Sequence, residues 1–125
     1  MSLSQNDNIV YVKSRLFAVR MINLCGQIRL NFHEYSLADQ VLRSATSIEA
    51  NISESTQAQS MKDFISKISI SLKEAAETSY WIDVLYHANI ISEKDYFSFD
   101  ADCDELIKLL TSIKKTSKDK LPKQS

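Results

Sequence analysis

The sequence predicts an all-α fold, a single up-down-up-down antiparallel four-helix bundle that takes in residues 1–125 as one domain. Three observations lead to this prediction. The 125 residues include only one glycine and one proline, so the chain has few of the residues that form the turns of a sheet protein. Apolar residues recur at alternating spacings of three and four along most of the chain. A pattern that is typical of helix starts precedes each of four such stretches.

That pattern is a serine followed three residues later by aspartate. The serine hydroxyl can accept a hydrogen bond from a free amide of the first turn, and the carboxylate lies at the positive end of the helix dipole. The four pairs are Ser4/Asp7, Ser36/Asp39, Ser60/Asp63 and Ser92/Asp95. We therefore expect helices at residues 8–34, 37–59, 61–89 and 93–117, with a basic flexible tail at 118–125. Because the connections are short, consecutive helices should be antiparallel.

The first predicted helix, 8–34, is apolar over a wider arc than one bundle core requires. One line of apolar residues contains Ile9, Val12, Leu16 and Val19. A second line contains Phe17, Met21, Leu24 and Ile28. A single core would not need both lines, so this helix has an apolar excess.

The second and fourth predicted helices each have one clear core seam with the spacing of left-handed bundle packing. The seam of the second helix, 37–59, consists of Ala38, Val41, Ala45, Ile48 and Ile52. The seam of the fourth helix, 93–117, consists of Tyr96, Phe99, Cys103, Leu106, Leu110 and Ile113. These residues should line the interior of the bundle.

The third predicted helix, 61–89, shows a second apolar side. Its expected seam is Ile65, Ile68, Leu72, Ala75, Ser79, Ile82 and Tyr86. At roughly 100° per residue, the only tryptophan, Trp81, points nearly opposite to Leu72. The residues Ile70, Val84 and Leu85 flank it. An outward apolar stripe with a tryptophan predicts self-association. The alternative is that the helix has a different phase, or that the fourth helix wraps further round it.

A polar stripe on the second helix completes the candidate interface. Its members recur at helical spacing and avoid the core seam: Arg43, Ser47, Asn51 and Glu54. Two carboxylates on the third helix, Glu74 and Glu77, lie beside the tryptophan stripe. An arginine from one helix and a glutamate from the other could pair across a helix or a subunit boundary, which would set register more than stability. The alternative is an ordinary solvated face.

Nothing in the sequence indicates an enzyme, a cofactor, a metal or a small-molecule substrate. A di-iron bundle needs Glu-x-x-His on two helices, and neither His33 nor His87 has a glutamate at that spacing. A ribonuclease site at Arg29 and His33 would need more than the three intervening residues found here. A histidine near the negative end of a helix is the simpler interpretation.

The remaining composition predicts a soluble cytoplasmic protein. The first eight residues lack a signal pattern, and no apolar run approaches the roughly 20 residues of a membrane helix. The two cysteines, Cys25 and Cys103, have no metal-ligand spacing and should be buried as small apolar residues. A net charge of −1 gives no general attraction to nucleic acid.

The second helix resembles the L..Q..RS..SI..NI.E signature of the four-helix-bundle proteins found as reading frames inside ribosomal RNA intervening sequences. The matching residues are Leu37, Gln40, Arg43, Ser44, Ser47, Ile48, Asn51, Ile52 and Glu54. The third helix continues the resemblance with Phe64, Lys67, Ser71, Leu72, Lys73, Glu74, Glu77, Thr78, Tyr80 and Trp81. The fourth helix adds Glu105, Leu106, Lys108, Leu110, Ile113 and Lys114. The family usually has glycine where this chain has Ser55, and it commonly has a proline between the first two helices.

The resemblance implies short up-down bundles that assemble into rings, typically homopentamers. We therefore expect a non-enzymatic homo-oligomer, pentameric by that resemblance, that acts as an interaction or scaffold module. The alternative is RNA or DNA binding, which the resemblance to a nucleic-acid-binding retroelement accessory bundle also suggests. In an up-down bundle one end would gather Lys13, Arg15, Lys62, Lys67, Lys114, Lys115 and Lys118. The other end would gather Glu34, Asp39, Asp83, Glu93, Asp95, Asp100 and Asp102. A ring would repeat the basic end around its axis.

Overall fold

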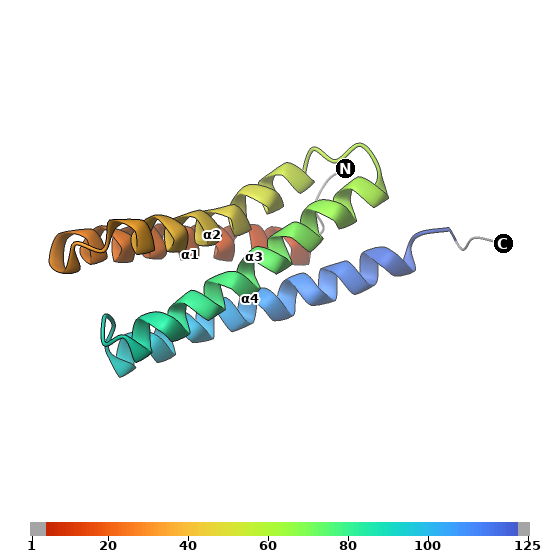
Figure 1. The fold of residues 1–125 in the computed structure, drawn as a ribbon. Helices are drawn as coiled ribbons and strands as arrows, with labels where there is room; N and C mark the ends of the chain where they lie inside the picture. The colour runs from red at the N-terminus through yellow and green to blue at the C-terminus, as the bar shows by residue number, and fades with distance from the viewer. Residues whose placement is uncertain (1–4, 123–125) are drawn as a thin grey trace.

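The chain forms four antiparallel helices in a computed structural model that describes residues 5–122, with side-chain detail from residue 8 onward. The helices are α1 (Gln5–Phe32), α2 (Tyr35–Ser55), α3 (Met61–His87) and α4 (Glu93–Asp119). Both ends of the described chain lie at one end of the bundle, and each helix runs opposite to the one before it (Figure 1). The predicted all-α, up-down four-helix fold is confirmed. Consecutive helices pack extensively, whereas α1 and α4 contact each other sparsely.

Two of the four predicted helix starts are confirmed by their caps. The Ser60 hydroxyl accepts a hydrogen bond from the Asp63 amide at 3.0 Å, and the Ser92 hydroxyl accepts one from the Asp95 amide at 3.1 Å. In both cases the capping serine has extended backbone angles, as an N-cap residue requires. The start expected at Ser4 lies outside the described residues.

The start predicted at Ser36 is wrong, because α2 begins earlier, at Tyr35. Its N-cap residue is Glu34, which makes no side-chain capping bond. The connection from α1 contains only residues 33 and 34, and His33 closes α1 with a left-handed φ of 56°. Ser36 therefore lies inside the first turn, and Asp39 forms an ion pair with Arg29 of α1 at 2.6 Å. A short, sharp turn left no room for a separate serine cap.

The other helix ends differ from the expected bounds by a few residues. α2 ends at Ser55 instead of residue 59, because three successive i to i+3 backbone bonds tighten the chain after it, beginning with Thr56 N to Ser53 O at 3.2 Å. α3 ends at His87, and Asn89 adopts a left-handed φ of 61° just beyond it. α4 continues to Asp119, so Lys118 is helical and is not the start of a flexible tail.

Most predicted core positions are buried. All five seam residues of α2 are fully buried. The second apolar line of α1, which consists of Phe17, Met21, Leu24 and Ile28, is fully or almost fully buried. In α4 the seam from Phe99 to Ile113 is buried, while Tyr96 is half-buried. Helices α2 and α4 therefore pack in the phase that the apolar periodicity predicts, and of the two apolar lines of α1 the second is the buried one.

The seam of α3 is rotated from the predicted one. Three expected members, Leu72, Ser79 and Tyr86, are only half-buried. The buried line is instead Phe64, Ile65, Ile68, Ser71, Ala75, Thr78, Ile82 and Leu85. Two hydroxyl residues belong to the core because their hydrogen bonds are made: Ser71 donates to the Ile48 carbonyl of α2 at 2.8 Å, and the Thr78 hydroxyl lies 3.0 Å from that of Ser44. The predicted seam of this helix contained neither of them.

The two cysteines are buried and free, as predicted. Burial raises the pKa of Cys25 to about 11 and that of Cys103 to about 12. The Cys103 thiol donates to the carbonyl of Ala75 on α3 at 3.3 Å. At neutral pH both are protonated thiols that fill core space.

Candidate functional site

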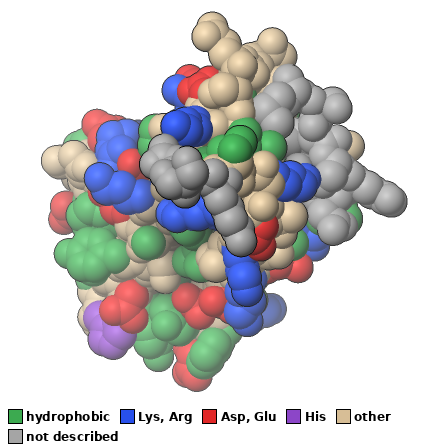
Figure 2. Space-filling model, turned by 90° about the vertical axis from the view of Figure 1, so that its right-hand side faces the viewer, with side chains coloured by type: hydrophobic (Ala, Val, Ile, Leu, Met, Phe, Trp, Pro, Cys, Tyr) green, Lys and Arg blue, Asp and Glu red, His purple; other side chains and the backbone are tan. Residues whose placement is uncertain are grey.

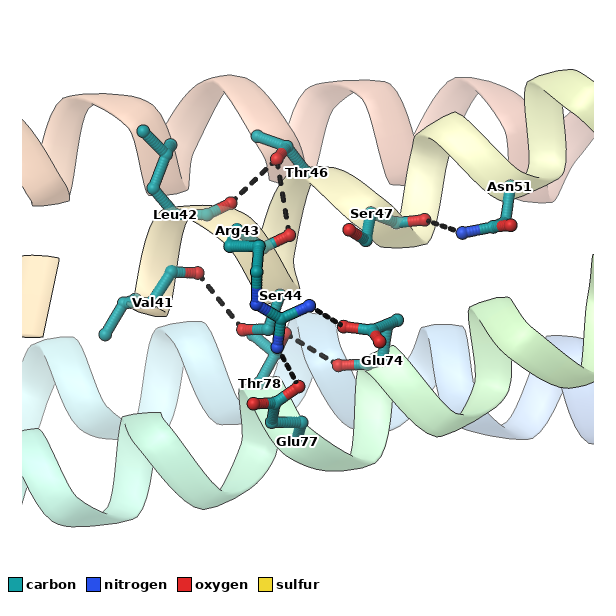
Figure 3. A network of polar contacts seen from close by, with 10 residues as sticks. All are labelled: Val41, Leu42, Arg43, Ser44, Thr46, Ser47, Asn51, Glu74, Glu77 and Thr78. Carbon is teal, nitrogen blue, oxygen red and sulfur yellow. Dashed lines mark hydrogen bonds and ion pairs between the residues drawn. The ribbon is translucent and has the colours of Figure 1, made fainter. Parts of the chain in front are cut away.

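The predicted arginine–glutamate pairing is present, and it joins α2 to α3 within one chain (Figure 3). The Arg43 guanidinium donates to Glu74 Oε2 at 3.1 Å and to Glu77 Oε2 at 2.5 Å. The hydrogen bond from Arg43 lowers the pKa of Glu77, and the bond to Glu77 raises the pKa of Arg43. The sequence left open whether this pairing crosses a boundary between helices or a boundary between subunits. In the structure it crosses the boundary between two helices of one chain.

The rest of the polar stripe on α2 also bonds within the chain. The Asn51 amide donates to the Ser47 carbonyl one turn earlier at 2.8 Å (Figure 3). Glu54 pairs with Lys67 of α3 at 3.2 Å. Two of the four stripe residues, Arg43 and Glu54, therefore tie α2 to α3. The role of the polar stripe in a subunit interface stays a prediction.

The predicted tryptophan stripe of α3 is divided between surface and core. Ile70 is 40% exposed, Trp81 and Val84 are half-buried, and Leu85 is fully buried. Placing Leu85 on the outward side was wrong, because the α3 seam lies about 90° from Trp81 rather than opposite to it. The Trp81 ring packs edge-on against Tyr80 with centroids 5.0 Å apart, and its indole Nε1 is buried without a hydrogen-bond partner among the residues that the structure describes.

The broadest outward apolar face lies on α1. The four residues of its first predicted line are exposed by 42–62%: Ile9, Val12, Leu16 and Val19. Ile22 and Leu30 add to the same helix at 47% and 76%. The predicted apolar excess of α1 is therefore real, and it faces away from the core. The interface residues chosen from the sequence omitted this face, although the double apolar line was the signal that could have identified it.

Each of the four basic residues of α1 forms an ion pair with a carboxylate of a neighbouring helix. Toward α2, Arg15 pairs with Glu49 at 3.1 Å and Arg29 pairs with Asp39. Toward α4, Lys13 pairs with Glu105 at 3.0 Å and Arg20 pairs with Asp102. The Arg20 guanidinium also lies 4.2 Å from the centre of the Phe99 ring. The cations of α1 thus bridge α1 to its neighbours on both sides of the exposed apolar line.

Two hollows lie between α1 and α4, where these helices pack sparsely. One, of about 270 Å³, is lined by Arg20, Asn23, Leu24, Gln27, Asp95 and Phe99. The other, of about 150 Å³, is lined by Lys13, Leu16, Phe17, Asp102, Glu105 and Leu106. Ion pairs cross this open side of the bundle, where α1 and α4 contact each other sparsely.

The predicted basic end is partly neutralised. Figure 2 views this end and shows Lys and Arg side chains alternating with acidic ones. Lys13, Arg15 and Lys67 pair with carboxylates of neighbouring helices. Among the side chains that the structure describes, residues 8–122, no ion pair is formed by the other four predicted contacts, which are Lys62, Lys114, Lys115 and Lys118. The last three line an open hollow of about 280 Å³ with Thr111 and Asp119.

The described residues contain no cluster of three or more His, Cys, Asp or Glu side chains that could hold a metal ion. No helix among them is long and apolar enough to span a membrane. Arg29 is engaged with Asp39, and His33 instead lies 3.2 Å from the Tyr35 hydroxyl. His87 pairs with Asp83 one turn earlier at 3.5 Å.

A solved structure and a family model both match this chain. The crystal structure of a protein of unknown function from the S23 ribosomal protein family of Bacteroides thetaiotaomicron VPI-5482 is similar, with a TM-score of 0.87 and 47% sequence identity. The match covers 89% of this chain and 99% of that one. Among curated proteins, none matches the chain. The model of the 23S rRNA-intervening sequence protein family matches residues 6–112. That match confirms the resemblance seen along helices two to four, and the chain belongs to the 23S rRNA-intervening sequence protein family.

Proposed function

We propose that the protein is a non-enzymatic homo-oligomer that serves as an interaction or scaffold module. The observation that carries the proposal is the outward face of α1, where Ile9, Val12, Leu16 and Val19 are each more than 40% exposed. Contiguous apolar surfaces of this kind are uncommon on monomers and are typical of contacts between proteins. The resemblance noted for the sequence implies five copies, and a pentamer is the assembly that we propose.

Mass in solution tests this proposal directly. Size-exclusion chromatography with light scattering at micromolar concentration should give a multiple of the 14.2 kDa chain mass, with five copies as the expected value. A multiple other than five would correct the proposed subunit number, and the proposal that the protein is an oligomeric interaction module would remain valid. A single species of 14.2 kDa that persists as the concentration is raised would overturn the proposal.

The second candidate function is RNA or DNA binding by the basic end. It is favoured by Lys114, Lys115 and Lys118, which share one hollow and have no ion-pair partner in the described part of the chain. Lysines that are free of carboxylates can neutralise phosphates and release their counterions. A ring would bring several copies of this cluster to one rim, which would raise the local positive potential despite a net charge of −1 per chain.

A triple variant separates this candidate from general charge effects. Changing Lys114, Lys115 and Lys118 to glutamine should abolish the binding of a labelled single-stranded RNA at low salt, measured by fluorescence anisotropy. The matched control changes Lys13, Arg15 and Lys67, which already have carboxylate partners, and should reduce binding much less. Wild-type binding should weaken steeply with added salt. No binding by the wild-type protein at low salt would remove this function.

A further inference from the structure

The outward face of α1 has the continuous heptad spacing of a helix–helix seam. Its residues alternate at steps of three and four over three turns and more, which is the repeat that lets two helices stay in contact by supercoiling. The a positions are Ile9, Leu16, Asn23 and Leu30. The d positions are Val12, Val19 and Gly26. All seven are exposed in the single chain, although Leu16 and Asn23 also border the two hollows between α1 and α4.

Asn23 is the one polar side chain at an a position of this seam. In parallel helices an a position meets the a position of its neighbour, so an asparagine there meets its own copy and can bond with it. In antiparallel helices an a position meets a d position, and the d residues here are Val12, Val19 and Gly26. None of these side chains can form a hydrogen bond, so a covered Asn23 would lose its solvent partners without replacement. Asn23 therefore favours parallel, in-register helices.

Gly26 is the only glycine of the chain, and nothing in its own chain requires it. A Cβ built at this position has no neighbouring atom within 4 Å, and glycine 26 does not have a positive φ. A glycine inside a helix costs about 1 kcal/mol relative to alanine. Close approach of a second backbone at a d position would account for this cost, because a glycine lets two helices come nearer than any side chain would.

The borders of the seam favour a second copy over a charged partner. Each basic residue beside it is paired with a carboxylate of α2 or α4: Lys13, Arg15, Arg20 and Arg29. A partner that covers this seam therefore contacts a line of apolar side chains, and the basic side chains on either side of the line are already paired with carboxylates. A second α1 has the same heptad line and the same neutralised borders, so the two surfaces are complementary in spacing and in charge.

We propose that α1 is the subunit contact, and that the outward faces of α1 from neighbouring copies run parallel and in register around the symmetry axis. The Asn23 side chains then lie at one level and bond with one another, and Gly26 allows close approach one turn further along. The inference rests on the proposed homo-oligomer and adds to it the element, the direction and the register of the contact. It places the contact on α1, whereas the sequence placed it on residues of α2 and α3.

The first test compares two equally exposed apolar residues. Leu16 is 62% exposed on the α1 seam, and Phe97 is 60% exposed on α4 away from it. Leu16→Glu should reduce the mass measured by native mass spectrometry to the 14.2 kDa monomer, while Phe97→Glu should keep the wild-type mass. Circular dichroism should show unchanged helix content for both. An oligomeric wild type with an oligomeric Leu16→Glu variant would overturn this inference and leave the proposed function intact.

The second test addresses direction and register through cross-linking. In the parallel arrangement, Asn23→Cys places the new thiols at one level, so mild oxidation should give a disulfide-linked dimer on a non-reducing gel. Phe97→Cys is the matched control and should stay uncross-linked. The native cysteines are buried and should not react. An oligomeric Asn23→Cys protein that does not cross-link would overturn the parallel register. A wild type that is monomeric would instead overturn the proposed function.

Discussion

Helices α1 and α3 both have more apolar residues than one core face needs, and the structure places the surplus differently. In α3 most of it is at least partly buried, since Leu85 is fully buried and Trp81 is half-buried, and only Ile70 is exposed, by 40%. In α1 it faces outward from Ile9 to Val19. The neighbours explain the difference, because α3 packs extensively against both α2 and α4, whereas α1 packs extensively against α2 and only sparsely against α4. The number of apolar residues on a helix therefore does not reveal an interface unless the neighbours on both flanks are known.

The largest effect should separate the two faces of α1. Phe17 is 2% exposed and Leu16 is 62% exposed, although they are adjacent in sequence. Phe17→Ala should lower the free energy of unfolding by about 3–5 kcal/mol, because it leaves a cavity in the core. Leu16→Ala should change it by less than about 0.5 kcal/mol in the dissociated chain. Urea unfolding, at a dilution where the midpoint no longer depends on protein concentration, measures both. A large loss in Leu16→Ala would mean that the outward face supports its own bundle.

The corresponding pair on α3 tests whether its surplus is core. Leu85 is fully buried, and Ile70 is 40% exposed. Leu85→Ala should cost about 2–5 kcal/mol of unfolding free energy, in the same dilute conditions. Ile70→Ala should cost less than about 0.5 kcal/mol. If both variants lost a similar, small amount of unfolding free energy, Leu85 would belong to the surface stripe that the sequence predicted. The difference between α3 and α1 would then be smaller than the structure indicates.

A smaller effect should report the polar contact that fastens α3 to α2. The folded pKa of Glu77 lies below its ordinary value of 4.5 because Arg43 bonds to it. The unfolded chain therefore takes up this proton at higher pH than the folded one, so the contribution to stability is full above pH 4.5 and is lost as the pH falls through the folded pKa. Arg43→Met should make unfolding free energy less dependent on pH across this acidic window. The difference should be modest, since the pair is partly exposed. If the unfolding free energy depended equally on pH in the wild type and in Arg43→Met, the contact between Arg43 and Glu77 would be absent in solution.

The smallest expected effect concerns the fluorescence of Trp81, the chain's only tryptophan, which should not change when the oligomer dissociates. If α1 carries the subunit contact, the surroundings of Trp81 are the same in the free and the assembled chain. Its fluorescence maximum should then stay constant through the dilution that dissociates the oligomer. A red shift on dissociation would place α3 in the contact and reverse the comparison.

The fold was predictable because its signals are local. The alternating apolar spacing located the cores of α2 and α4, and the caps at Ser60 and Ser92 marked two helix starts correctly. For α1 it gave two apolar lines, and only the structure shows which of them is core. The phase of α3 was not predictable in the same way, because Ser71 and Thr78 are buried only where an acceptor on α2 is in reach. The cap at Ser36 failed for a similar reason, since a two-residue turn moved the start of α2.

The candidate site was predictable only in part, because it depends on which elements meet. The sequence placed Arg43 opposite Glu74 and Glu77, and the structure joins all three. It also gathered seven cations at one end of the bundle, but it did not show that Lys13, Arg15 and Lys67 each have a carboxylate partner on another helix. Whether a surface is free or occupied is decided by contacts between distant segments, which periodicity does not contain.

The lysine-rich end of the bundle has a consequence for how assembly and ligand binding are coupled. In the assembly proposed above, Lys114, Lys115 and Lys118 of every chain would come to the same rim, where they would repel one another. Raising ionic strength shortens the screening length from about 10 Å at 0.1 M to about 3 Å at 1 M, so salt should tighten the oligomer. The same salt should release a bound polyanion. A polyanion lying across the rim would itself relieve the repulsion, so ligand and oligomer should stabilise each other most strongly in dilute buffer.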